Sequence, residues 1–299
     1  MISGIIPVDK PAGFTSFDVV AKVRGITHQK KIGHSGTLDP MATGVLPLFF
    51  NEATKTLSIL QDEDKKYVAC LKFGIKTDTQ DITGKILSQK ESSVSYELFA
   101  EVIKKFTGRQ FQVPPMYSAT KINGVPLYDL ARQGIEVERK SKEIQIYSID
   151  IKSFDEQNQK AEIEVSCGRG TFIRTLISDM GDMLGCGAVM TDLRRTKACG
   201  FDISECLSLE EIQVLSNQGN LEGKAVSPKR LFQNLPKIVL GEYDSRLYSN
   251  GVELELKKRN FPHMNGLIAI FNESGNLLGI SEMNLDENKL KLIKMLNIE

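Results

Sequence analysis

The chain has 299 residues, of which 41% are hydrophobic and 25% charged, a composition typical of a globular protein with one large or two unequal domains. Its 38 basic and 38 acidic residues give a formal net charge of zero, which counts against a uniformly basic nucleic-acid-binding protein but allows a local basic patch. No apolar run approaches the ~20 residues of a membrane-spanning helix, and the N-terminus lacks the features of a signal peptide, so we expect a cytoplasmic protein.

The five cysteines include no C-x-x-C pair, which predicts buried free thiols rather than a disulfide framework or a zinc site. Basic residues gather in short clusters, and each cluster taken alone is more typical of a solvated surface than of a nucleic-acid contact. These clusters are Lys30–Lys31, Lys65–Lys66, Lys104–Lys105, Arg194–Arg195 with Lys197, and Lys257–Arg259.

The first third of the chain predicts a strand, a helix and a shaped loop. Residues 2–8 form a short apolar run that is typical of a strand. Ser16 is a suitable N-cap for a helix with valines at 19, 20 and 23 on its apolar side. Residues 33–44 are polar and rich in glycine, which predicts a loop.

Strands and helices alternate through the middle of the chain. We expect a strand over residues 67–75 and a helix over 95–107, capped by Ser95 and ended by Gly108. Apolar residues at 161, 163 and 165 alternate with glutamates, which predicts a half-buried strand. A helix should then run from about 171 to 185, and Ser208 with Glu211 forms the capping box of another.

The composition of the sequence changes after residue 217. Residues 217–236 are polar and irregular, and the short alternating runs 238–240, 267–271 and 277–283 that follow are punctuated by glycines. This pattern predicts a small β domain over 236–299, after a larger domain over 1–235.

The loop of residues 33–44 reads GHSGTLDPMATG and contains one carboxylate, Asp39. It lacks the Gly-Lys-Ser/Thr of a phosphate loop and the repeated acidic residues of an EF-hand. From the loop alone, Asp39 before Pro40 is either a turn former or a chemically active group.

Several motifs together resemble the bacterial tRNA pseudouridine-55 synthases, the TruB family. The resemblance covers nearly the whole chain, and the order of the motifs is more specific than any one of them. The motifs are VDKPAG at 8–13, GHSGTLDPMATG at 33–44, KY at 66–67, TDTQDITG at 77–84, PPMYSA at 114–119, GVPLY at 124–128, GTFIR at 170–174 and LRRT at 193–196.

The resemblance implies an α+β fold: a catalytic domain built on a long, mixed, largely antiparallel sheet, with the catalytic loop in a central basic cleft, and a small C-terminal PUA-like domain that binds RNA. It implies isomerisation of one uridine in the T loop of tRNA. The enzyme breaks the N1–C1′ bond, turns the base and rejoins it through C5. We expect no metal, no other cofactor and no obligate protein partner, and we expect a monomer.

The resemblance assigns Asp39 as the catalytic carboxylate and Arg174 as the cation that pairs with it. Asp39 would attack the sugar, attack the base, or remove the C2′ proton, and the sequence leaves these roles open. Arg174 could otherwise be an exposed helix residue, but its neighbours Phe172, Ile173 and Leu176 are apolar.

The resemblance also implies a pocket for a base that has left its stack. Tyr67 matches the residue that stacks on this base and could relay the C5 proton, and Leu193 matches the apolar residue beneath it; either could instead be plain core. Phe172 stands where relatives often have tyrosine, and His34 matches a residue that stacks on the flipped-out nucleotides. Lys10 with Pro11 matches a pair that supports the catalytic loop.

Four other interpretations stay open. Asp78 and Asp81 could hold a metal, although a turn rich in threonine and glycine explains them more simply. The protein could bind or chaperone RNA without catalysis, or act on another RNA. A nucleoside hydrolase or glycosidase would ordinarily need a second carboxylate across the bond, and no candidate stands out.

Overall fold

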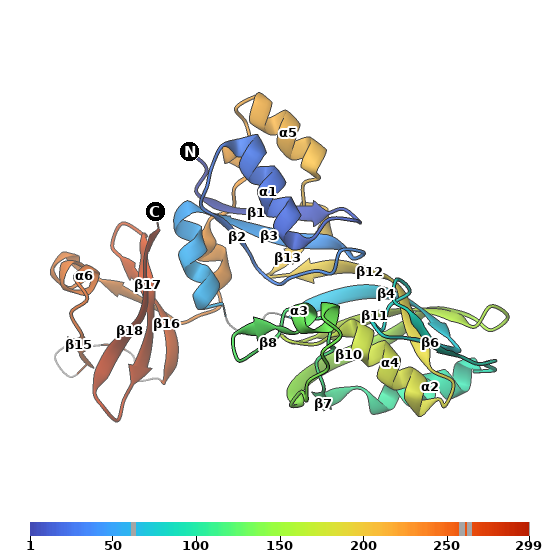
Figure 1. The fold of residues 1–299 in the computed structure, drawn as a ribbon. Coiled ribbons are helices and arrows are strands. Elements are labelled where there is room, and N and C mark those ends of the chain that lie inside the picture. Colours follow the sequence, from blue (N-terminus) through green and yellow to red (C-terminus); the bar gives the residue numbers. More distant parts are fainter. Residues whose placement is uncertain (61–63, 257–260, 262–264, 299) are drawn as a thin grey trace.

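The computed structural model of the chain describes residues 1–60, 64–256, 261 and 265–298. These residues form two large sheets with helices packed against them, and two small two-stranded sheets (Figure 1). Within these described ranges, no helix is long and apolar enough to cross a membrane. The predicted basic cluster Lys257–Arg259 lies outside the described residues.

The larger sheet has nine strands, and its main path runs β1-β3-β12-β4-β11-β10-β7, with β2 beside β3 and β13 beside β12. Only the β3–β12 pair in this sheet is parallel. The strands are β1 (Gly4–Lys10), β2 (Ile32–His34), β3 (Thr43–Phe50), β4 (Lys65–Phe73), β7 (Gly108–Gln112), β10 (Lys142–Asp155), β11 (Lys160–Cys167), β12 (Ala188–Ala198) and β13 (Phe201–Asp202).

Strand β4 has one buried face and one partly exposed face. Its alternate residues Tyr67, Ala69 and Leu71 are buried, whereas the residues between them are partly exposed. β11 alternates in the same way, so the predicted half-buried strand is confirmed. The expected strand over 67–75 is interrupted, because Gly74 takes a positive φ of 83° that strands do not accommodate, and the chain continues as β5 (Ile75–Thr77).

Two pairs of helices cover different parts of the sheet. Helices α2 (Tyr96–Lys105) and α4 (Ile173–Met183) lie on the same face of the β4–β11–β10 region, whereas α1 (Ser16–Thr27) and α5 (Leu209–Asn217) pack together beside β1 (Figure 1). The apolar sides of these helices and strands form two cores. The predicted N-cap Ser95 is present in α2, and the predicted Ser208–Glu211 capping box is present in α5.

The predicted cap of α1 was wrong by one residue. Thr15 is the N-cap, and it forms a capping box with Asp18. Ser16 is instead buried, and its hydroxyl accepts a hydrogen bond from the Leu38 amide at 2.9 Å. Ser16 therefore anchors the loop that carries Asp39, which is a tertiary role that a local capping rule cannot anticipate.

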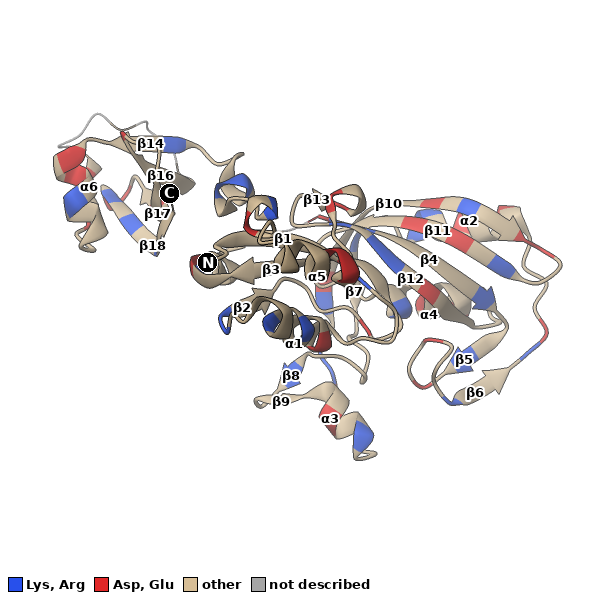
Figure 2. Cartoon of the chain, turned by 90° about the horizontal axis from the view of Figure 1, so that it is seen from above, with Lys and Arg blue, Asp and Glu red and all other residues tan. Residues whose placement is uncertain are grey.

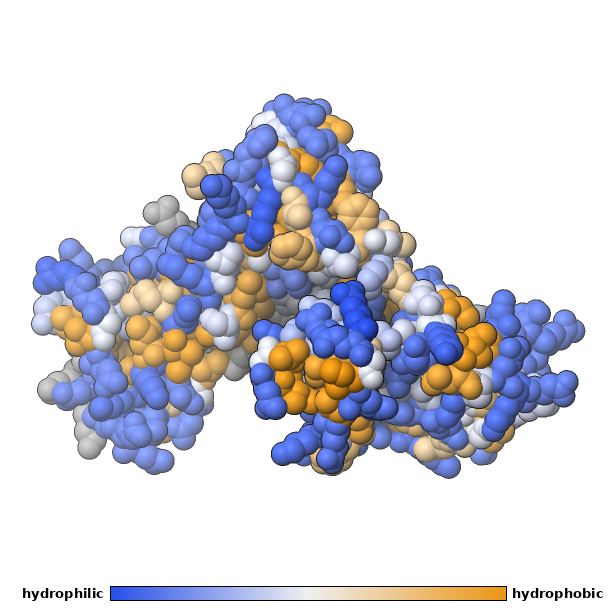
Figure 3. Space-filling model, in the orientation of Figure 1, coloured by the Kyte–Doolittle hydropathy of each residue, from blue (hydrophilic) through white to orange (hydrophobic). Residues whose placement is uncertain are grey.

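Short elements project from the larger sheet: a hairpin of β5 with β6 (Ile86–Gln89), a hairpin of β8 (Lys121–Ile122) with β9 (Val125–Pro126), and helix α3 (Leu127–Arg132). Apolar side chains gather on the surface around β8 and α3 (Figure 3). Val125, Tyr128 and Ile135 contribute exposed area there. The segment 118–120, which leads into this projection, also lines the main cleft.

The second sheet has the order β14-β16-β17-β18-β15 and packs on helix α6, which agrees with the predicted α+β class and its small PUA-like β domain. Its first strand begins just after the predicted boundary at residue 235. The sequence pattern missed α6 and β18. The elements are β14 (Lys237–Leu240), α6 (Glu242–Ser249), β15 (Leu254–Glu255), β16 (Gly266–Asn272), β17 (Leu277–Asn284) and β18 (Lys289–Ile298).

Apolar contacts join the second sheet to the first part of the chain. Phe232, in the 3₁₀ segment Pro228–Phe232, packs in one cluster with Ala269 and Leu296 of the second sheet. Ile59, which follows the 3₁₀ helix η1 (Asn51–Ser58), packs against the same cluster. The two parts therefore share a small apolar interface.

Charged residues of both signs are interspersed over the sheet and helices (Figure 2), which agrees with the zero net charge. Arg195 belongs to a basic cluster that we expected to be solvated, but it does not lie at the surface. Arg195 is 1% exposed, so the expectation of a solvated position was wrong for this residue.

Candidate active site

A cleft of about 560 Å³ lies where the loop after β2 meets β4, β12 and the N-terminal end of α4. Every residue that the sequence singled out for catalysis or base binding lines this cleft. These residues are His34, Asp39, Tyr67, Phe172, Arg174 and Leu193.

The loop that carries Asp39 is fixed at both ends and in its middle. Strands β2 and β3 pair with each other on either side of it, and the Leu38 side chain is buried. The Ala42 amide donates to the Asp39 carbonyl at 3.1 Å, which closes a turn. The backbone of Asp39 therefore forms the turn that one interpretation predicts, and its side chain points to α4. Its chemical role stays a prediction.

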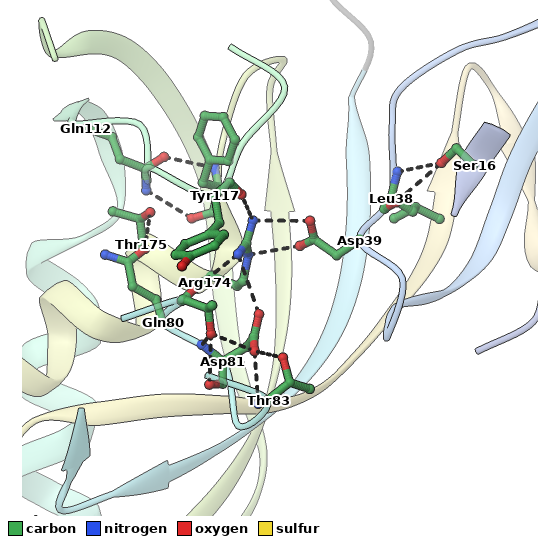
Figure 4. A network of polar contacts seen from close by, with 12 residues as sticks. Ser16, Leu38, Asp39, Gln80, Asp81, Thr83, Gln112, Tyr117, Arg174 and Thr175 are labelled. Atoms are coloured by element: carbon green, nitrogen blue, oxygen red, sulfur yellow. Dashed lines mark hydrogen bonds and ion pairs between the residues drawn. The ribbon is translucent and has the colours of Figure 1, made fainter. Parts of the chain in front are cut away.

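Arg174 binds the Asp39 carboxylate through two nitrogens (Figure 4). Its Nε lies 2.9 Å from Oδ2, and its Nη2 donates to Oδ1 at 3.1 Å. The remaining donors of Arg174 bond to the carbonyls of Thr79 at 3.0 Å and Tyr117 at 2.8 Å, and Nη1 lies 3.5 Å from Asp81 Oδ2. The guanidinium is therefore held in one orientation from several sides.

The start of α4 is itself anchored. The Gln112 side chain accepts a hydrogen bond from the Phe172 amide at 2.8 Å and donates one to the Phe172 carbonyl at 3.1 Å. Thr175 donates to Gln80 at 2.7 Å. Arg174 lies between these anchors and is 5% exposed, so the alternative reading of an exposed helix residue was wrong.

Burial is the main influence on the Asp39 carboxyl, and it raises the pKa of this group above its ordinary value. The positive charge of Arg174 opposes this effect, whereas the negative charge of Asp81 adds to it. The Asp39 side chain retains 33% exposure, while that of Arg174 retains 5%. The carboxylate is thus partly open to the cleft, and its counter-ion lies behind it.

Tyr67 and Leu193 project from neighbouring strands into the cleft. Tyr67 on β4 is 7% exposed and Leu193 on β12 is 5% exposed. Burial raises the pKa of the Tyr67 hydroxyl, and the positive charge of Arg195 partly opposes this effect. The two residues therefore supply an aromatic ring and an apolar surface on the same wall.

Phe172 and His34 lie at other parts of the cleft lining. Phe172 comes just before α4, and its ring carries no hydroxyl for a hydrogen bond. His34 ends β2, and burial lowers the pKa of its imidazole, so the neutral form is favoured. Within the described part of the chain, His34 Nδ1 is buried without a hydrogen-bond partner.

Lys10 lies beneath the catalytic loop and is fully buried. Its ammonium group donates to three carbonyls, those of Pro11, Phe14 and Pro40. Pro40 follows Asp39 directly, so this contact ties the loop to the end of β1. Burial lowers the pKa of Lys10 to about 8.

Asp81 and Arg195 were not among the predicted site residues. Asp81 was read as a turn former, and it does accept hydrogen bonds from Thr79 Oγ1 at 2.9 Å and the Thr83 amide at 3.0 Å. It also pairs with Arg174 through Nη1, a nitrogen that does not bind Asp39, and it does not line the cleft. The spacing of its motif gave no signal for this pairing, since 93 residues separate Asp81 from Arg174.

Asp78 fits the turn reading, since its carboxylate accepts a hydrogen bond from the Lys85 amide at 2.8 Å. Among the residues that the structure describes, no three His, Cys, Asp or Glu side chains converge on a point where they could hold a metal ion. The expectation that the enzyme needs no cofactor stays a prediction.

A mixed sheet thus carries a cleft that is lined by an aspartate–arginine pair and a tyrosine. The family model "TruB family pseudouridylate synthase (N terminal domain)" matches residues 24–173, and the model "tRNA pseudouridylate synthase B C-terminal domain" matches residues 174–233. The chain belongs to the TruB family of pseudouridylate synthases.

Curated relatives agree with this assignment. The chain is 41% identical to the tRNA pseudouridine synthase B of Clostridium acetobutylicum over 297 residues, which cover 99% of this chain and 100% of the relative. It is 39% identical to the protein of the same name from Stutzerimonas stutzeri over 288 residues, which cover 95% of this chain and 93% of the relative.

Solved structures share the fold. The structure titled as the archaeal box H/ACA sRNP Nop10-Cbf5 complex contains a chain with a TM-score of 0.73 and 24% identity, over 98% of this chain and 86% of that one. A chain in a Cbf5-Nop10-Gar1 complex has a TM-score of 0.73 and 24% identity, over 99% of this chain and 83% of that one. Because both identities are below 25%, these matches describe the architecture of both parts of the chain and no more.

Proposed function

We propose that this enzyme converts uridine 55 in the T loop of tRNA to pseudouridine, with Asp39 as its catalytic carboxylate. Relatives named tRNA pseudouridine synthase B match almost the full chain. The observation that carries the assignment to Asp39 is its two-point pairing with buried Arg174 at the edge of the cleft.

The target base must leave the RNA stack to reach Asp39. The cleft is large enough for a nucleotide, and Tyr67 offers an aromatic face on which the uracil stacks. Leu193 supplies an apolar surface, and His34 holds the neighbouring flipped-out nucleotides. Phe172 adds apolar area without a hydrogen bond.

Cleavage of the N1–C1′ bond leaves positive character on the sugar. The Asp39 carboxylate stabilises this charge, forms a bond to the sugar or base, or removes the C2′ proton; each route needs its ionised form. Arg174 keeps Asp39 ionised and oriented within a site that otherwise raises its pKa. Lys10 and Pro11 support the loop from beneath.

Rejoining through C5 leaves a proton on that carbon, and this proton must be removed. Tyr67 is a suitable group because it lines the cleft together with Asp39 and carries a hydroxyl. In this proposal its ring holds the base and its hydroxyl relays the C5 proton.

The second sheet supplies further contacts to the tRNA. We assign residues 1–235 to the catalytic domain and 236–299 to a PUA-like RNA-binding domain, because the second sheet begins at Lys237. Phosphate contacts from this part would position the tRNA without reading its sequence. The enzyme acts as a monomer in the cytoplasm.

The test is to map pseudouridine in an unmodified tRNA transcript exposed to the purified protein. Conversion is expected at uridine 55 alone, and a transcript with cytidine at that position should gain none. Binding without conversion would favour an RNA chaperone, and conversion at another uridine would favour a synthase of different specificity.

A further inference from the structure

Arg195 is a buried cation that the proposed mechanism does not yet use. It lies on β12, two residues after Leu193, and is one of the largest fully buried side chains in the described part of the molecule. Burying a guanidinium is costly unless its donors are satisfied, so its partners are informative.

The partners of Arg195 lie on either side of Asp39 in the sequence. Its Nε donates to the Val45 carbonyl at 2.7 Å, and its Nη2 donates to the Gly36 carbonyl at 2.9 Å. One side chain thus joins the first turn of the catalytic loop to the strand β3 that follows the loop.

Arg195 also lies beside Tyr67. The two residues are register partners on the antiparallel strands β12 and β4, and both line the cleft. The positive charge of Arg195 partly opposes the effect of burial on the pKa of the Tyr67 hydroxyl. Arg195 therefore bonds to the loop of Asp39 and neighbours Tyr67 in the sheet.

The glycines of the loop leave room for this arrangement. A side chain at position 44 would place its Cβ against the backbone of Arg195, and one at position 36 would place its Cβ 3.0 Å from Arg195 Nη1. Both glycines have positive φ, 103° at Gly44 and 71° at Gly36. The two glycines therefore stand at the positions of the loop where a Cβ would crowd Arg195.

We infer that Arg195 is a positioning residue that holds the Asp39 loop and the neighbouring Tyr67 in one geometry for the reaction. It acts through these two groups. Lysine cannot replace it, because a single ammonium nitrogen cannot reach both carbonyls in the directions that the guanidinium does. This inference rests on the proposed function.

The experiment compares Arg195→Lys and Arg195→Met with wild type in single-turnover pseudouridine formation. Each rate is divided by the concentration of protein that is able to bind tRNA. Arg194→Met is the matched control, because Arg194 is the next residue on β12 and pairs with Asp9 outside the cleft. We expect both Arg195 variants to react about 100-fold more slowly, as misplacement by about 1 Å can cause. Their Kd for tRNA should stay within about threefold of wild type, and the control should be near normal in both measurements.

A second arm combines Arg195→Lys with Tyr67→Phe. If Arg195 acts partly through the Tyr67 hydroxyl, the lysine substitution should cost clearly less in the phenylalanine background, about tenfold or below, because the two effects are coupled. An equal loss in both backgrounds would overturn the link to Tyr67.

Two further outcomes would overturn the inference as a whole. One is a normal rate in both Arg195 variants. The other is loss of tRNA binding together with rate in both, since Arg195 would then be only part of the core. Failure of the proposed function is separate, because the wild type itself would then form no pseudouridine.

Discussion

The guanidinium of Arg174 holds the carboxylate of Asp39 by two nitrogens, although 135 residues separate them in the chain. Asp81 approaches the same guanidinium from another side at 3.5 Å. One buried cation thus serves two carboxylates, of which only Asp39 lines the cleft. The hydrolase alternative needs a second carboxylate across the scissile bond, and Asp81 lies behind Arg174 instead.

Replacing Asp39 with Asn should abolish pseudouridine formation while leaving tRNA binding largely intact. Asparagine keeps the shape and removes the charge, and Arg174 keeps Asp81 and two carbonyls as partners, so the fold should persist. We expect a loss of at least about 10³-fold, which corresponds to roughly 4 kcal/mol in the activation free energy. Turnover within tenfold of wild type would show that Asp39 is not the catalytic group.

Replacing Asp81 with Asn tests whether the rear partner of Arg174 matters to the reaction. The variant should lower the rate by about 10–100-fold and destabilise the fold by about 1–3 kcal/mol, because a buried charged hydrogen-bond network loses one partner. Single-turnover rates and thermal unfolding measure the two effects. Asp78→Asn is the control, since Asp78 lies in the same turn without contacting Arg174. Equal rates in the two variants would contradict the prediction.

Replacing Tyr67 with Phe separates stacking from proton transfer. Phenylalanine keeps the ring and loses the hydroxyl, so the variant should bind tRNA and react at least ~100-fold more slowly. Tyr67→Leu also loses the ring and should be worse, since a stacking face contributes ~1–3 kcal/mol per base. Single-turnover experiments with saturating enzyme measure chemistry apart from binding. Near-normal turnover by Tyr67→Phe would leave only the stacking role.

Catalysis needs the ionised form of Asp39, and burial raises the pKa of this carboxyl above its ordinary value of 3.8. The midpoint of the acidic limb in the pH–rate profile should therefore lie above pH 3.8. The rate should fall as pH decreases through the raised pKa. A pH–rate profile of the wild type at saturating enzyme checks this. An acidic limb at or below 3.8 would contradict it.

An alkaline limb near pH 8 is expected from Lys10, whose pKa burial lowers to about 8. Loss of its proton leaves two donors for three carbonyls, which loosens the contact to Pro40. The free energy of unfolding should rise from about pH 8 to 10.5, because the unfolded chain keeps this proton up to its ordinary pKa of 10.5. Between about pH 8 and 10.5, a rate that falls while the free energy of unfolding does not fall therefore points to Lys10. The pH–rate profile of Lys10→Met should lack this alkaline limb.

Activity should survive exhaustive chelation. No metal-binding cluster occurs among the residues that the structure describes, and the proposed steps use only side chains of the protein. The assay compares rates before and after EDTA treatment, with separate confirmation that the tRNA remains folded. Loss of activity that zinc or magnesium restores would overturn the prediction.

Local chemistry in the sequence was enough to predict much of the fold. The alternation at 161–165 predicted β11, and Ser95 and Ser208 marked helix starts correctly, because these patterns reflect contacts within a few residues. The ordered motifs also named six of the residues that line the cleft. Their roles in catalysis remain predictions for the variants above.

The tertiary structure decided what depends on contacts between distant segments. Ser16 looked like a helix cap but anchors Leu38, and Arg195 looked like a surface residue but lies buried between the Asp39 loop and Tyr67. Asp81 formed the expected turn and also reached Arg174. A side chain's local pattern shows which bonds it can make, whereas the folding of the sheet determines which partner comes within reach.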